Sequence, residues 1–343
     1  MKRLLNTLYV TTKGAYLARE GETVQVRLDS TVKLSVPIHL LGGIVCFGAV
    51  TCSPYLLDLC GERQVVVSFL TEYGRFQARV HGPVSGNVLL RRTQYRQADD
   101  AQRSAELARL MVSAKIANCR TVLLRAARER PDDDAQREIV QAADQLANTL
   151  RRLREPMPLD ILRGWEGDAA KGYFRVFDHL ITKQKEDFYF HERSRRPPLD
   201  CVNGLLSFLY TLLVHDVTSA LEAVGLDPAV GYLHTDRPGR PGLALDIMEE
   251  FRPFLADRLA LSLINRQQIK GKGFDSTETG ATRMDDETRK TVLVAYQERK
   301  QEEIEHPFLK EKMPVGLLPH VQALLLVRCL RGDLETYPPF IWR

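Results

Sequence analysis

"DAQRSAELARLMVSAKIANCRTVLLRAARER" (residues 100–130) is the stretch at which the chain changes its pattern. Apolar residues recur here at spacings of three and four, which predicts a long amphipathic helix. A second helix is predicted over "DDDAQREIVQAADQLANTLRRL" (residues 132–153). Further helices are predicted over residues 167–185, 199–225, 243–268, 286–304 and 316–331. The chain is therefore expected to be all-α from about residue 98 onward.

The part before this stretch has a different rhythm. Short runs such as "TLYVTT" (7–12), "TVQVRLD" (23–29) and "QVVVSFL" (64–70) are rich in β-branched residues, which predicts strands. One short helix is expected at "SPYLLDLCGE", with Ser53 as N-cap and Pro54 in its first turn.

The predicted fold class is therefore α+β, with a small N-terminal β-rich domain and a larger all-α domain. The N-terminal domain is expected over residues 1–83 and the helical domain over residues 98–343. Residues 84–97 are predicted to be a linker, since "HGPVSGNV" (81–88) contains glycine and proline.

Composition narrows the class of protein. The 343 residues are 44% hydrophobic, which is enough for a sizeable core. None of the six cysteines forms a CxxC pair, so the sequence predicts buried free thiols and a reducing cytoplasm. The apolar run Gly204–Val214 is shorter than the ~20 residues that a membrane span needs, so no membrane segment is expected.

Positive charge is unevenly distributed. The net charge of +4 does not by itself imply a nucleic-acid partner, but residues 91–130 hold ten Lys or Arg against four Asp or Glu. "HERSRRPP" (191–198) and "NRQQIKGKGF" (265–274) add further basic residues. Solvated helix faces explain any one of these runs, yet several basic segments in one helical domain favour a polyanionic partner.

One stretch combines an imidazole with acids: "GYLHTDRPGRPGLALDIMEEFRP" (231–253). His234 precedes a Pro- and Gly-rich loop, and Asp246, Glu249 and Glu250 follow in a helix predicted to begin near Leu243. Acids are common at helix starts, and a lone histidine is more often structural than a ligand. The loop could nevertheless fold His234 over the helix. A site of one imidazole nitrogen and several carboxylate oxygens suits Mg²⁺ or Mn²⁺.

A third acid could complete that site. Glu166 lies between two glycines in "RGWEGDAAKGYF" (163–174), at a predicted helix start. It could be an ordinary N-terminal acid, but flanking glycines allow close approach to another backbone. With His234 and Glu249 it would provide three metal ligands, and Arg237 and Arg240 could hold a phosphate nearby.

Four segments together resemble one known family, the CRISPR adaptation integrases, which are metal-dependent DNA endonuclease/integrases that insert new spacers into CRISPR arrays. The segments are "GWEGDAAKGYF" (164–174), "RSRRPPLDCVNGLLSFLYTLL" (193–213), the stretch 231–253 and "HPFLKEKMPVGLLPHVQALLLVRCLRGDLETYPPFIWR" (306–343). The closing "YPPFIWR" resembles the branch that accompanies type I-C systems.

The resemblance implies roles for particular residues. The family's metal ligands fall on Glu166, His234 and Glu249, with Asp246 as an accessory acid and Mg²⁺ or Mn²⁺ as the ion. Many members have Asp at the last ligand, so the choice between Glu249 and Glu250 stays open.

The resemblance to the integrase family also implies partners. Residues expected to face DNA are Arg196, Arg240, Arg252, Lys270 and Lys272, whereas Asn203 and Tyr210 are either near the site or structural. The family works on double-stranded DNA as homodimers joined through the N-terminal domain, together with a small companion adaptation protein. In its reaction a DNA 3′-hydroxyl attacks the phosphodiester at the border of a repeat.

Two other functions are compatible with parts of the pattern. A DNA-binding scaffold would use the basic segments alone, and the acids would be ordinary helix-start residues. A zinc hydrolase acting on a small molecule is the third hypothesis, although the chain has no HExxH motif.

Overall fold

The computed structural model describes residues 6–72, 76–80, 82, 88–130, 133–278 and 280–342. The chain divides into two compact units, residues 1–86 and 87–343. Each unit has its own secondary structure and its own core.

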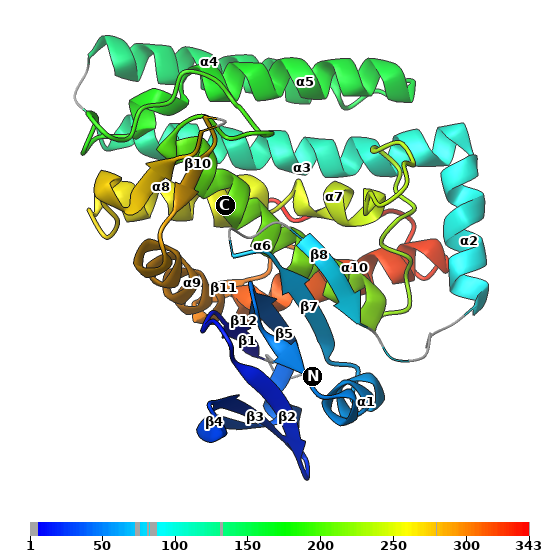
Figure 1. Ribbon diagram of the computed structural model, residues 1–343. Helices are drawn as coiled ribbons and strands as arrows, with labels where there is room; N and C mark the ends of the chain where they lie inside the picture. Colours follow the sequence, from blue (N-terminus) through cyan, green and yellow to red (C-terminus); the bar gives the residue numbers. More distant parts are fainter. Residues whose placement is uncertain are drawn as a thin grey trace. The chain divides into compact units, whose positions relative to one another are not determined.

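The N-terminal unit contains two four-stranded sheets (Figure 1). One has the order β1-β5-β7-β8, in which the first three strands are parallel and β8 is antiparallel to β7. The other has the order β4-β3-β2-β6. The strands are β1 (Asn6–Val10), β2 (Tyr16–Glu20), β3 (Thr23–Leu28), β4 (Thr31–Pro37), β5 (Leu41–Phe47), β6 (Thr51–Cys52), β7 (Val66–Leu70) and β8 (Phe76–Val80).

The short helix of this unit begins as predicted. Helix α1 (Pro54–Glu62) starts with Ser53, whose hydroxyl oxygen accepts the Leu56 N–H at 3.1 Å. This satisfies a donor that the first helical turn leaves unpaired. Leu56 is fully buried with Leu17 and Ile44 in the core of the unit.

The second unit is mainly helical, which confirms the predicted fold class, with two additional two-stranded ladders. Helices α3, α4 and α5 pack along one another (Figure 1). The helices are α2 (Val88–Asp99), α3 (Ala101–Arg128), α4 (Asp134–Arg152), α5 (Leu159–Arg175), α6 (Cys201–Ala223), α7 (Gly242–Met248), α8 (Arg258–Asn265), α9 (Asp286–Gln301) and α10 (Leu318–Leu330), with the π-helical turn η3 (Arg252–Asp257). The ladders pair β9 (Phe274–Ser276) with β10 (Thr282–Met284), and β11 (Glu303–Glu305) with β12 (Lys312–Pro314).

The predicted linker contains a helix. Residues 84–87 lie outside the described part of the chain, but residues 88–97 belong to α2. Gln94 of this helix is fully buried and donates to the carbonyl oxygens of Asp227 and Val230. These contacts attach α2 to the helical unit, which is why the segment is ordered as a helix.

Two of the differences from the predicted helix boundaries concern the candidate site. Helix α5 begins at Leu159 after Pro158, so Glu166 lies in its middle and not at a helix start. A Cβ on Gly164 or Gly167 would meet no atom within 4 Å, so these glycines make no close approach. The predicted helix 243–268 is broken, because α7 ends at Met248 and the chain enters η3 before Pro253.

Helix α6 has the most apolar long sequence of the described helices. It has 23 residues and is long enough to cross a membrane by length and composition, but 67% of its most apolar window is buried inside the structure. The helix therefore resembles the core helix of a protein interior. All six cysteines are free, as expected, and three of them are buried.

Candidate active site

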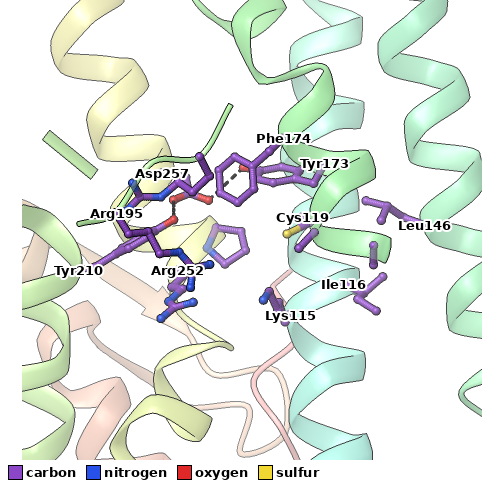
Figure 2. Close-up of a pocket in the computed structure, with 14 residues that line it drawn as sticks. Lys115, Ile116, Cys119, Leu146, Tyr173, Phe174, Arg195, Tyr210, Arg252 and Asp257 are labelled. Carbon is purple, nitrogen blue, oxygen red and sulfur yellow. Dashed lines mark hydrogen bonds between the residues drawn. The ribbon is translucent and has the colours of Figure 1, made fainter. Parts of the chain in front are cut away.

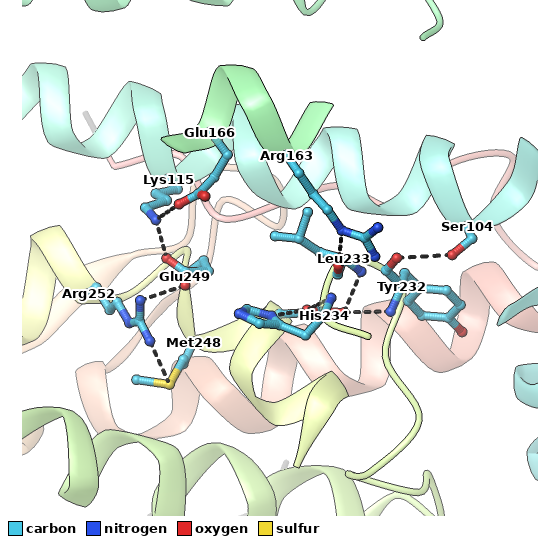
Figure 3. Close-up of polar contacts among 11 residues, drawn as sticks. Ser104, Lys115, Arg163, Glu166, Tyr232, Leu233, His234, Met248, Glu249 and Arg252 are labelled. Carbon is cyan, nitrogen blue, oxygen red and sulfur yellow. Dashed lines mark hydrogen bonds and ion pairs between the residues drawn. The ribbon is translucent and has the colours of Figure 1, made fainter. Parts of the chain in front are cut away.

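Two glutamates from different elements meet at one lysine. Glu166 projects from α5, Glu249 lies at the end of α7, and both carboxylates form ion pairs with the Lys115 ammonium on α3 (Figure 3). The distance from Lys115 Nζ to Glu249 Oε2 is 2.7 Å. The Lys115 and Glu249 side chains are only 9% and 3% exposed, so this cluster is largely removed from water.

A second cation fixes Glu249. Arg252 Nη1 donates to Glu249 Oε1 at 2.6 Å, and its guanidinium also lies over the Tyr210 ring. Burial opposes ionisation of Glu249, but Arg252, Lys115 and, more weakly, His234 hold the pKa of this carboxyl well below its usual range. Burial likewise acts to lower the pKa of Lys115, yet Glu249 and Glu166 raise it overall. Glu249 and Lys115 are thus both charged at neutral pH.

His234 is oriented by Asp246. Its Nδ1 lies 2.6 Å from Asp246 Oδ1, so the ring donates from this nitrogen to the carboxylate. Nε2 is then the nitrogen able to coordinate an ion, as in the carboxylate–histidine pairs of metal sites. Figure 3 shows the ring pointing toward Glu249 and Arg252.

The backbone before His234 is held on both sides. Asp246, which is fully buried, accepts the backbone N–H groups of Tyr232, Leu233 and His234 at 2.6, 2.9 and 3.1 Å. On the opposite side, Arg163 donates twice to the Leu233 carbonyl oxygen, at 2.9 and 2.8 Å. With four donors directed at it, the Asp246 carboxylate is committed to positioning this segment.

Gly231 leaves room for that arrangement. A Cβ at this position would lie 2.7 Å from Asp246 Oδ2 and 2.9 Å from the Leu243 nitrogen. Both distances are too short for any side chain without displacement of its neighbours. The glycine is therefore required by the close approach of the His234 segment to α7.

Glu249 and Glu250 point to different surroundings. Glu250 is fully buried and accepts hydrogen bonds from Tyr337 Oη at 2.8 Å, Phe340 N at 2.7 Å and Gln322 Nε2 at 3.0 Å. Burial raises its pKa to about 8, although these donors lower it. Glu250 thus anchors the C-terminal segment, whereas Glu249 faces Lys115.

A pocket adjoins the lysine cluster (Figure 2). At its far side Asp257 accepts hydrogen bonds from Tyr210 Oη at 2.6 Å and Tyr173 Oη at 3.1 Å. Apolar and basic side chains complete the lining: Lys115, Ile116, Cys119, Leu146, Ala169, Ala170, Phe174, Arg193, Arg195, Arg252 and Pro253. Burial raises the pKa of Asp257 to about 6, against the two tyrosines, which lower it.

The raised pKa of Asp257 leads to a prediction about how the stability of the protein depends on pH. Between the ordinary value of 3.8 and about 6, folded Asp257 binds more protons than unfolded Asp257, so the free energy of unfolding falls as pH rises through this window. The slope from this group reaches about 1.4 kcal/mol per pH unit at most. Asp257→Asn should remove it, as measured by urea unfolding of both proteins from pH 4 to pH 7. The exposed Asp168→Asn variant should keep the wild-type slope, and a wild-type slope in Asp257→Asn would contradict the assignment.

The residues expected to face DNA fall into three groups. Arg196 and Arg240 belong to a cluster of arginines, Lys270 and Lys272 lie in an exposed turn, and Arg252 lies inside the site. Arg240 is partly buried, and besides burial its pKa is lowered by Arg237, Arg163 and Arg196, so these guanidinium groups lie close enough to repel one another. In the exposed turn, Lys270 donates to Gln267 Oε1 at 3.0 Å.

Arg252, by contrast, is engaged inside the site, and its side chain is 15% exposed. Asn203 is a buried structural amide that binds Arg193 and the Glu192 carbonyl oxygen. Tyr210 lines the pocket.

The side chains present are chemically suited to a divalent ion. As they are arranged, no three His, Cys, Asp or Glu side chains among the described residues are grouped so as to hold a metal ion. Glu166 and Glu249 nevertheless converge on one cation, Lys115, and His234 presents a correctly oriented nitrogen beside them. Carboxylate oxygens with one imidazole are a donor set that Mg²⁺ and Mn²⁺ accept.

Sequence reasoning did not identify Lys115, Arg163 or Asp257. Lys115 follows Met111 and precedes Cys119 by four residues, and both of these are buried. A lysine in the apolar stripe of a predicted helix was a detectable signal, because buried lysines need a charged partner. Arg163 and Asp257 carry no comparable signal, since their partners are distant in sequence.

Comparisons with known proteins identify the family of this chain. The family model described as "CRISPR associated protein Cas1" matches residues 8–298. A CRISPR-associated endonuclease Cas1 from Chlorobaculum tepidum is 58% identical over 343 residues, which is 100% of both chains.

Solved structures show the same fold. A Cas1 protein from Thermotoga maritima superimposes with a TM-score of 0.82 and 26% identity, over 96% of this chain and 97% of that one. A casposase bound to its integration product gives a TM-score of 0.83 over 99% and 95% of the two chains, and at 20% identity this likeness is one of fold. The chain belongs to the Cas1 family of CRISPR-associated proteins.

Proposed function

We propose that this protein is a divalent-metal-dependent DNA endonuclease and integrase that joins new spacer DNA to a CRISPR array. The observation that carries the proposal is the convergence of Glu166 and Glu249 on one buried cation beside an imidazole oriented by Asp246. The name of the C. tepidum relative, an endonuclease, agrees with it. Glu166, His234 and Glu249 would hold Mg²⁺ or Mn²⁺.

The reaction is a phosphoryl transfer. The oxygen of a DNA 3′-hydroxyl forms a new bond to phosphorus, and the bond from phosphorus to the departing strand's 3′-oxygen breaks and leaves a new 3′-hydroxyl. Water in place of the DNA hydroxyl gives hydrolysis. A divalent ion bound at the site would polarise the phosphoryl oxygen and lower the pKa of the attacking group.

The surrounding residues position the proposed metal ligands. Arg252 holds Glu249 in place, and Asp246 fixes the tautomer and direction of His234. We assign Arg252 this positioning role in place of the direct DNA contact that the sequence suggested. Arg196 and Arg240 belong to the arginine cluster near the His234 loop, which is suited to bind backbone phosphates. Lys270 and Lys272 are proposed as more distant phosphate contacts.

Partners follow from the family. We propose a homodimer formed through the N-terminal unit, where the edge strand β4 exposes Val32 at 46% and Leu34 at 45%. Exposed apolar residues on a strand edge favour pairing with another chain. A small companion adaptation protein and double-stranded DNA complete the proposed assembly in the cytoplasm, and the C-terminal "YPPFIWR" favours a type I-C system.

The test uses a supercoiled plasmid that carries a CRISPR repeat and a labelled duplex with 3′-hydroxyl ends. The protein is incubated with both in Mn²⁺, in Mg²⁺, in Zn²⁺ and in EDTA, with and without the companion protein. Covalent joining of label to plasmid in Mn²⁺ or Mg²⁺, and its loss in EDTA, are expected. Binding that persists in EDTA without any joined or nicked product in any ion would favour a DNA-binding scaffold and contradict the proposal, as would activity restricted to Zn²⁺.

Asp246→Asn tests the orientation of His234 separately from its presence. The amide can keep only part of the set of four acceptor contacts, so the ring loses its fixed direction. Mn²⁺ affinity measured by calorimetry is expected to fall about 10- to 100-fold. Asp236→Asn, in the exposed part of the same loop, is the control and should bind Mn²⁺ like the wild type. Unchanged affinity in Asp246→Asn would show that Asp246 does not orient a ligand.

A further inference from the structure

Lys115 occupies the position between the two carboxylates that the proposed function gives to a metal ion. Its ammonium forms ion pairs with Glu166 and with Glu249 Oε2, the latter at 2.7 Å. Lys115 is 8% exposed and lies on the apolar face of α3 between Met111 and Cys119. A lysine is found in such a place only where its charge has partners.

The charges explain why the lysine is needed. Without a cation, two carboxylates that face each other in a largely buried site would repel strongly. Lys115 and Arg252 together balance Glu166 and Glu249. A divalent ion bound to the same oxygens would add two further positive charges beside the ammonium. Ion and ammonium therefore compete for the same carboxylates.

We propose that Lys115 is an internal counter-cation of the metal site, which holds Glu166 and Glu249 together in the metal-free protein and releases them when the ion binds. This inference rests on the proposed function, because it requires a divalent ion at these carboxylates. Lysine suits the role, since it is a single point charge on a flexible stem of four carbons.

The pocket beside the cluster offers space for the Lys115 side chain when it leaves the two carboxylates. Lys115 is one of its lining residues, and Asp257 lies on the same pocket (Figure 2). An ammonium released from Glu249 would turn into this pocket, where Asp257 is the one carboxylate among the apolar and basic lining residues that the structure describes.

The test compares Lys115→Met with the wild type in the absence of DNA. Lys171→Met, which removes an exposed lysine from α5, is the matched control. Melting temperature is measured by calorimetry in EDTA, and Mn²⁺ affinity by titration calorimetry and by the electron paramagnetic resonance signal of free Mn²⁺. Lys115→Gln, which keeps a hydrogen-bond donor, replaces the methionine variant if that variant does not fold.

Lys115→Met is expected to melt a few degrees lower than the wild type in EDTA. It is expected to bind Mn²⁺ at least about tenfold more tightly, because no ammonium competes. Mn²⁺ should then raise its melting temperature by more than it raises that of the wild type.

Equal or weaker Mn²⁺ binding by Lys115→Met, with normal binding by the wild type, would overturn the inference and leave the metal site in place. Absence of Mn²⁺ binding by both proteins would overturn the proposed metal site itself, and the inference with it. Binding of Mn²⁺ by Lys115→Met alone would support competition between the ion and the Lys115 ammonium.

Discussion

Glu249→Gln is expected to abolish both joining and nicking of DNA, with the rate falling at least about 10³-fold. The substitution keeps the size of the side chain but removes its charge. It takes away one of the two carboxylates that meet at Lys115 and leaves Arg252 without its anion. Rates are measured with the labelled duplex and repeat plasmid in Mn²⁺, and duplex binding is measured in parallel.

Glu250→Gln is the matched control, since it makes the same chemical change one residue away. Glu250 is equally buried, but its hydrogen bonds go to Tyr337, Phe340 and Gln322. This variant should retain joining activity within about tenfold of the wild type. Full activity in Glu249→Gln, or loss confined to Glu250→Gln, would reverse the roles given to these two acids.

Phe340→Ala is expected to destabilise the helical unit by about 3–5 kcal/mol. The Phe340 side chain is fully buried and packs against Phe251, Phe254 and His306. Its truncation leaves a cavity in the layer that supports η3 and Glu250. Urea unfolding followed by circular dichroism measures the change.

The neighbouring residue provides the control for Phe340. Ile341 is 37% exposed, and Ile341→Ala should cost less than about 1 kcal/mol. Similar losses for the two variants would mean that the C-terminal segment is not packed as described. The segment matters for the site because the Phe340 N–H donates to Glu250, the residue that follows Glu249.

The sequence predicted most helices and strands, but not how they are interrupted or how they contact one another. Helix α3 was evident because its apolar stripe is long, and α1 because Ser53 and Pro54 mark its start. Strand β4 was missed although Val32, Leu34 and Val36 alternate with polar residues, which is the sequence pattern of a strand. The break between α7 and α8 was missed because the apolar pattern continues through η3, although Pro253 signals an interrupted helix.

The sequence pointed to some residues of the candidate site but not to Lys115, and it did not show the contacts among them. The three expected ligands came from motifs, and the structure brings Glu166 and Glu249 to the same lysine. Their spacing along the chain could not show that Asp246 would accept four hydrogen bonds from residues 232–234, or that Glu250 would bind the C-terminal segment. These contacts join residues that are distant in sequence, and only the folded chain brings them together.

The most direct test of the metal site is the anomalous scattering of Mn²⁺ in crystals of this protein. One strong peak is expected within bonding distance of Glu166, Glu249 and Nε2 of His234. A peak bound to other residues, or no peak at these three side chains at saturating Mn²⁺, would contradict it.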